Sequence, residues 1–144
     1  MTYYIASDHA GLKEKSFIKD LLEKKGFIVA DLGPDSEDRV DYPDYAKKVA
    51  IKVLEENAKG ILICGTGIGM SLTANKFPKI RAALCHNEFS AKMAREHNDA
   101  NILCLGARVS GFGMLEEILN AWLGSEFEGG RHLQRVEKID SKVG

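Results

Sequence analysis

The chain has 144 residues and a formal net charge of −1, with 20 Lys and Arg against 21 Asp and Glu. Apolar residues make up 44% of it and charged residues 28%, which is typical of a globular domain. The balanced charge excludes a general affinity for nucleic acid or a membrane surface, so any basic site must be local. No apolar run reaches the length of a membrane span, and the N-terminus lacks a signal pattern. We expect one cytoplasmic domain, residues 1–144.

The three cysteines, Cys64, Cys85 and Cys104, are far apart and show no CxxC spacing. An odd number of isolated cysteines favours reduced thiols over a disulfide framework or a metal cluster. Cys85 and Cys104 each end or lie in an apolar run, and we interpret them as buried, inert thiols. Because adjacent strand residues point to opposite faces, Cys85 and His86 are not expected to act as a dyad.

Apolar runs and amphipathic stretches alternate along the chain. The runs predict strands at 3–6, 27–33, 60–64, 80–85 and 102–105. The amphipathic stretches predict a first helix that begins near Leu12 and stops at Gly26, and further helices at 43–57, 87–96 and 111–123. Another helix is predicted after the glycine-rich loop, and a short one in the tail. The strand runs are nearly all apolar, which indicates burial on both faces. The pattern predicts a three-layer α/β/α sandwich with a Rossmann-like, five-stranded parallel sheet.

Ligands of such sheets bind where the strands end, so residues just after each strand are candidates. Asp8 and His9 follow the first strand, and Arg108 follows the fifth. Asp8 is suited to capping the next helix. His9, beside that helix start, could bind a phosphate or transfer a proton.

The stretch CGTGIGMS (64–71) follows the third strand and opens a helix. Its row of backbone N–H groups could hold a ligand phosphate or a developing oxyanion, or the glycines could only permit a tight turn. It has neither the lysine of a P-loop nor a full dinucleotide fingerprint. The N–H groups after Cys64 favour a thiolate, which can act as a base or a nucleophile.

Two further groups remain open between a surface role and a functional one. His97 and Asn98 lie in the loop before the fifth strand. Arg131 and Arg135 are spaced i,i+4, so a helix places both on one face. The preceding Gly129–Gly130 hinge would let these arginines reach a phosphate, including one on a neighbouring subunit.

Several motifs together resemble ribose-5-phosphate isomerase type B, in a family that includes galactose-6-phosphate and allose-6-phosphate isomerases. They cover nearly the whole chain in order: SDHAG (7–11), DYPDYA (41–46), ILICGTGIGMSLTANK (61–76), IRAALC (80–85), HND (97–99), LGARVSG (105–111), AWLG (121–124) and EGGRHLQRV (128–136). The resemblance implies interconversion of ribose 5-phosphate and ribulose 5-phosphate in the pentose phosphate pathway, with no cofactor and no metal. The sugar ring opens, and a proton then moves between C2 and C1 through an enediolate.

The resemblance also implies a role for each candidate residue. Cys64 is the base, Thr66 assists at the reacting oxygens, and His97 helps to open the ring. Asp8 holds sugar hydroxyls or the ring oxygen, and Asn98 is a further contact. The remaining substrate contacts are the loop N–H groups of Gly65, Gly67, Ile68, Gly69, Met70 and Ser71, the pocket residue Tyr42, and the phosphate cluster His9, Arg108, Arg131 and Arg135. One branch of the family has a glutamate base where this chain has Met70 and lacks the loop cysteine, so the cysteine branch is the better fit.

In the family the site lies between two subunits, which implies a homodimer or homotetramer with the tail (about 128–144) packed on a partner. Neither nucleic acid nor a membrane is an expected partner. Three other functions stay open: isomerisation of a six-carbon sugar phosphate such as allose 6-phosphate or galactose 6-phosphate, non-catalytic sugar-phosphate binding, and a redox role for the thiols.

Overall fold

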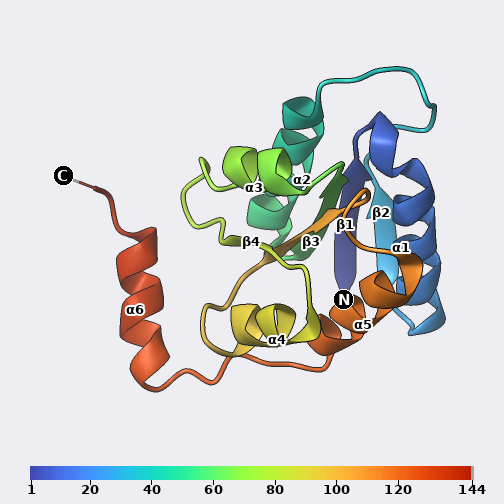
Figure 1. The fold of residues 1–144 in the computed structure, drawn as a ribbon. Coiled ribbons are helices and arrows are strands. Elements are labelled where there is room, and N and C mark those ends of the chain that lie inside the picture. The colour runs from blue at the N-terminus through green and yellow to red at the C-terminus, as the bar shows by residue number, and fades with distance from the viewer. Residues whose placement is uncertain (144) are drawn as a thin grey trace.

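The computed structural model describes residues 1–143, which form one five-stranded parallel sheet and six α-helices (Figure 1). The strands are β1 (Thr2–Ser7), β2 (Ile28–Asp31), β3 (Lys59–Cys64), β4 (Ala82–Leu84) and β5 (Ile102–Gly106), in the spatial order β2-β1-β3-β5-β4. A 3₁₀ turn (His9–Gly11) precedes α1 (Leu12–Lys24); the other helices are α2 (Tyr42–Glu56), α3 (Ile68–Ala74), α4 (Glu88–Glu96), α5 (Phe112–Leu123) and α6 (Arg131–Asp140). The predicted parallel α/β architecture and the short tail helix are confirmed.

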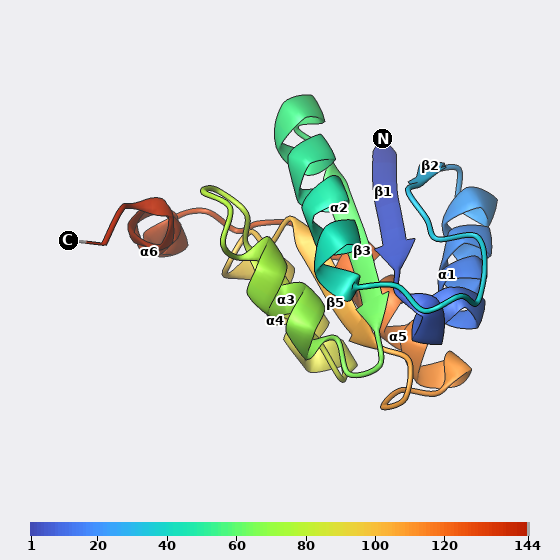
Figure 2. The ribbon, with the colours of Figure 1, turned by 90° about the horizontal axis from the view of Figure 1, so that it is seen from above.

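Helices cover both faces of the sheet, with α2 and α3 on one side and α1, α4 and α5 on the other (Figures 1 and 2). Alternate strand residues feed the two layers. In β3, for example, Ile61 and Ile63 join the core under α1 and α5, whereas Leu62 and Cys64 join the core under α2. Burial on both faces is the reason the strands read as continuous apolar runs.

Two strands are shorter than predicted, β2 at 28–31 and β4 at 82–84. Before β4, the N–H of Ile80 bonds back to the carbonyl of Phe77, and the N–H of Arg81 donates to the Asn101 side chain at 2.8 Å. The Arg81 carbonyl accepts from the N–H groups of Asn101 and Ile102, so residues 80–81 lie beside the start of β5 but ahead of the three-residue strand β4. After β2, the Asp31 carboxylate accepts from the N–H of Gly33 at 2.9 Å, while backbone hydrogen bonds from Leu32 to Ile5 and from Ser7 to Gly33 keep this segment beside β1.

The sheet order creates a switch point between β1 and β3. The chain leaves β1 toward β2 on one side and leaves β3 toward β4 on the other, so the connections separate and open a crevice at the carboxyl ends of the two strands. The N–H of Asp8 donates to the carbonyl of Ile63 at 3.0 Å and ties the two strand ends together. Asp8 and Cys64 therefore lie at neighbouring strand ends.

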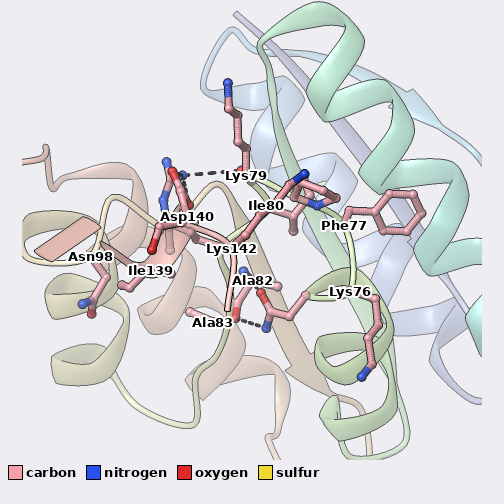
Figure 3. A pocket seen from close by; sticks show the side chains of 15 residues that line it. Lys76, Phe77, Lys79, Ile80, Ala82, Ala83, Asn98, Ile139, Asp140 and Lys142 are labelled. Carbon is pink, nitrogen blue, oxygen red and sulfur yellow. Dashed lines mark hydrogen bonds and ion pairs between the residues drawn. The ribbon is translucent and has the colours of Figure 1, made fainter. Parts of the chain in front are cut away.

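The last helix, α6, stands away from the rest of the molecule beyond β4 (Figure 1). Arg81 binds both carboxylate oxygens of Asp140 on α6, at 2.9 and 3.1 Å. Between α6 and the segment 75–83 lies a pocket of about 520 Å³, which Asn98 also lines (Figure 3). Among residues 1–143, no helix combines the length and apolar character that a membrane crossing requires.

Candidate active site

Cys64 is the last residue of β3, and only 5% of its surface is exposed. Its Sγ accepts a hydrogen bond from the backbone N–H of Gly67 at 3.1 Å. The sulfur of Cys64 therefore faces a backbone donor at the start of the loop. Burial raises the pKa of Cys85 and raises that of Cys104 further. The prediction that Cys85 and Cys104 are buried is confirmed.

The loop after Cys64 is shaped by its glycines. Gly67 has a φ of 81°, and a Cβ there would lie 2.9 Å from the backbone carbonyl of Leu105. A side chain at Gly69 would collide with the ring of Tyr42. The loop thus lies against β5 on one side and Tyr42 on the other. The first helix residues have N–H groups without an intrahelical partner, so those of Gly69 and Met70 are available to a ligand.

A pocket of about 380 Å³ opens beside this loop. It is lined by Tyr42, Cys64, Gly65, Thr66, Ile68, Gly69 and Leu72. Six of these residues are sequence candidates, and the fold brings them together. Gly67, Met70 and Ser71 do not line it. The N–H of Gly67 donates to Cys64, and the Met70 side chain is fully buried in the core under α2, so only its backbone can serve a ligand. Leu72 was not anticipated; its place one turn after Ile68 on the helix was the available signal.

Asp8 and His9 lie across the crevice, at the end of β1. Asp8 Oδ1 accepts from the N–H of Ala10 at 2.9 Å, which confirms the capping prediction. His9 Nδ1 accepts from the N–H of Val40 at 3.2 Å. Because that nitrogen is an acceptor, a neutral His9 carries its proton on Nε2 and presents a donor there.

The segment between β2 and α2, which contacts His9 through Val40, is in turn bound by Lys15 of α1. Lys15, 4% exposed, donates from Nζ to the Asp31 carboxylate at 2.9 Å and to the carbonyl of Pro34. On the other side of the crevice, the Arg108 side chain passes over Gly65, with Cδ 3.6 Å from where a Cβ of Gly65 would be. Asp8, His9, Tyr42, Arg108 and the loop with Cys64 therefore share one edge of the sheet, which we call the thiol half-site.

The other candidates gather elsewhere. His97 caps the end of α4, and its ring stacks on that of His132 with centroids 4.2 Å apart and planes 14° apart. Arg131, next to His132, and Arg135, one turn later, are exposed on α6. We call His97, Asn98, Arg131 and Arg135 the histidine half-site.

The two half-sites lie toward opposite ends of the strands: the thiol half-site at their carboxyl ends and the histidine half-site near the amino end of β5. Cys64 pairs in register with Gly106, the last residue of β5, whereas His97 precedes Ile102, the first. The four residue steps from Ile102 to Gly106 along β5 span about 13 Å. His97 is separated from Ile102 by a further loop, residues 97–101. A single chain therefore does not bring His97 to the thiol.

Sequence reasoning did not single out Glu128 and His132, which contact His97. Glu128 Oε1 lies 3.8 Å from His97 Nε2 and 3.6 Å from His132 Nε2. The i,i+4 spacing of Glu128 and His132 was the available signal. Burial, followed by the charge of His97, lowers the pKa of His132, which favours the neutral ring.

Within residues 1–143, His97, Glu128 and His132 form a group of residue types that can bind a metal ion. Their candidate ligand atoms all lie within 4.8 Å of one another. Tetrahedral zinc with bonds of about 2.0–2.1 Å needs ligand atoms roughly 3.4 Å apart. The observed spacings are wider, and stacked rings direct their nitrogens side by side rather than at one point. The arrangement suits mutual support of side chains better than metal coordination.

Comparison with known proteins places this geometry in a family. Residues 3–139 match the family model described as Ribose/Galactose Isomerase. Ribose-5-phosphate isomerase B of Escherichia coli is 50% identical over 92% of this chain and 89% of its own. A ribose-5-phosphate isomerase B structure from Clostridium thermocellum superposes with a TM-score of 0.95 at 51% identity, covering 97% of this chain and 95% of that one.

The enzyme of Mycoplasma genitalium, solved with bound ribulose-5-phosphate, superposes with a TM-score of 0.93 at 44% identity, covering 96% of this chain and 93% of that one. Sequence, fold and near-complete coverage in both directions agree. The chain belongs to the ribose/galactose isomerase family.

Proposed function

We propose that this protein is a ribose-5-phosphate isomerase, which interconverts ribose 5-phosphate and ribulose 5-phosphate in the cytoplasm as a step of the pentose phosphate pathway. The observation that carries the proposal is the Cys64 thiol, hydrogen-bonded by Gly67 at the mouth of a loop pocket. The half-identical E. coli relative and the neighbour solved with ribulose-5-phosphate support the substrate.

In the proposed reaction, Cys64 takes the proton from C2 of the open-chain aldose and returns it to C1, while the hydroxyl proton moves from O2 to O1. A C–H beside a carbonyl is a weak acid, so the developing enediolate oxygen must be stabilised. The N–H groups at the start of α3 and the Thr66 hydroxyl supply donors beside the thiol. One such preorganised donor is worth about 3 kcal/mol in other enzymes. The mechanism uses side chains and backbone alone and needs no cofactor.

The phosphate binds away from the reacting carbons. His9 presents Nε2–H, and Arg108 lies over the loop from the far side. Binding energy from the phosphate then positions C1 and C2 against Cys64. Asp8, held at the strand end, faces the sugar hydroxyls or the ring oxygen in this proposal.

The complete site forms between two copies of the chain, as a homodimer or homotetramer. The thiol half-site of one copy meets the histidine half-site of another, whose tail of about 128–144 packs on the first. The support is geometric: the two half-sites lie toward opposite ends of the strands, and α6 stands away from its own chain (Figure 1). A two-fold axis satisfies both copies at once.

Arg131→Ala and Arg135→Ala should each raise KM for ribose 5-phosphate by about tenfold or more while changing kcat less, because a charge-assisted hydrogen bond contributes roughly 1.5–3 kcal/mol. Steady-state kinetics and inhibition by inorganic phosphate measure this effect. Lys138→Ala, an exposed cation on the same helix, is the matched control. If KM and phosphate inhibition were unchanged in both arginine variants, α6 would have no role in binding the phosphate.

The direct test is the substrate preference of the purified protein. We expect kcat/KM for ribose 5-phosphate to exceed that for allose 6-phosphate by about 10- to 100-fold, since one extra carbon changes transition-state binding by roughly 1–3 kcal/mol. Added chelator should leave the rate unchanged. A clear preference for the six-carbon substrate would instead assign the protein to the allose or galactose branch. No turnover of either would favour a binding protein.

A further inference from the structure

Two side chains outside the proposed reaction hold His97 in place. The His132 ring lies 4.2 Å from the His97 ring and nearly parallel to it, so it covers one face of that imidazole. The Glu128 carboxylate faces the Nε2 atoms of both rings, at 3.8 and 3.6 Å. Neither residue has a part in the proton transfer between C2 and C1.

The backbone and His132 anchor the contact in the fold, whereas the Glu128 side chain is 53% exposed. The N–H of Glu128 donates to the carbonyl of Glu96 at 3.0 Å, which fastens the segment before α6 to the end of α4. His132, only 6% exposed, follows in the first turn of α6. His97 is half-buried, so stacking leaves part of its ring accessible.

Opening of the sugar ring requires an imidazole in a defined orientation, which the contacts of His132 and Glu128 with His97 would provide. When the sugar ring opens, the C1–O4 bond breaks and its electron pair stays on O4, which gains a proton. The O1–H bond gives up a proton, and its electron pair forms the C1=O1 carbonyl. An imidazole that relays this proton must be aimed at the ring oxygen, and a histidine ending a helix has free torsions. A stacked ring fixes its plane, and a carboxylate on one nitrogen leaves the other for the substrate.

We propose that His132 and Glu128 are positioning residues that orient His97 for opening the sugar ring. The inference rests on the proposed function, in which His97 relays the ring-opening proton. His132 supplies a flat, uncharged face, consistent with the lowered pKa that burial gives it. Glu128 faces a ring nitrogen and balances positive charge on His97 during the relay.

The experiment compares two reactions that share Cys64 but differ in ring opening. Ribose 5-phosphate is almost entirely cyclic in water, so its conversion requires the ring to open. Ribulose 5-phosphate is acyclic because its O5 carries the phosphate, and exchange of its C1 hydrogen with D₂O requires only the base and the oxyanion donors. The variants are His132→Ala, His132→Phe and Glu128→Gln, with Gln134→Ala, an exposed neighbour on α6, as the matched control.

We expect His132→Ala to lower kcat for ribose 5-phosphate by about 100-fold, as misplacement of a catalytic group does, with little change in KM. Exchange at C1 of ribulose 5-phosphate, followed by proton NMR, should stay near the wild-type rate. His132→Phe keeps a flat ring for stacking and should recover most of the loss. Glu128→Gln should lower kcat but leave KM and exchange unchanged.

The inference would be overturned by equal loss of conversion and exchange in His132→Ala, by no loss of either, or by a phenylalanine variant as poor as the alanine one. A loss confined to KM would also do so, because it would indicate that His132 only places the arginines of α6. His97→Ala separates this inference from the proposed function. If His97→Ala converts ribose 5-phosphate normally, the role of His97 itself is wrong; if it fails while His132→Ala does not, only the positioning role is wrong.

Discussion

Replacing Cys64 with alanine should lower kcat for ribose 5-phosphate by about 10³-fold, within the 10²–10⁴ that a positioned acid or base contributes. The thiol lines the loop pocket, and its Sγ accepts a hydrogen bond from the backbone N–H of Gly67. Removing Sγ leaves the N–H groups and the phosphate contacts in place, so binding of a phosphate ligand should persist. Steady-state turnover and calorimetric titration with inorganic phosphate measure the two effects separately.

Cys85→Ala is the matched control, because Cys85 is a buried thiol in the core on the other face of the sheet. Its kcat should stay within about twofold of the wild type, as expected of a small change remote from the chemistry. A Cys64→Ala variant that kept most of its turnover would place the base elsewhere. A redox role would instead show as inactivation by oxidants that bound substrate does not prevent.

Two inactive variants should restore each other if the site is shared between subunits. A heterodimer of Cys64→Ala with His97→Ala contains one site in which the intact thiol of one chain meets the intact imidazole of the other, and a second site that lacks both. Purified with two affinity tags, such a heterodimer should show about half of the wild-type kcat per dimer, because a two-fold interface builds two equivalent sites. Each parent homodimer should stay nearly inactive.

The control pairs two residues of one half-site. Cys64→Ala and Asp8→Ala both alter the thiol half-site, so every site of that heterodimer carries one defect and no rescue is expected. The predicted difference follows from the register, in which Cys64 lies beside the last residue of β5 and His97 precedes the first. Absence of rescue in the Cys64–His97 heterodimer would mean that His97 acts within its own chain or not at all.

Much of the fold follows from local patterns in the sequence. Apolar runs placed all five strands, Gly26 ended α1 as expected with a φ of 92°, and Asp8 caps the turn after β1. The thiol half-site follows from the same patterns, because residues directly after parallel strands must meet at one edge of the sheet. Cys64, its glycine loop, Asp8 and Arg108 are therefore neighbours in any sheet of this kind.

Only the tertiary structure decided the features that depend on contacts between distant segments. The sequence does not reveal that Met70 points into the core under α2, nor that the N–H of Arg81 bonds the Asn101 side chain ahead of a short β4. It also does not reveal that His132 stacks on His97, because that contact depends on Glu128 fastening the tail to α4.

The separation of His97 from Cys64 was also decided by the tertiary structure and not by local sequence patterns. Hydrophobic periodicity and turn residues report the state of a short segment, and they determined the strands, the caps and the thiol loop. Strand order, register and the path of the tail are set by burial summed over the whole chain. These long-range choices put Cys64 at the carboxyl end of β3 and His97 before the amino end of β5.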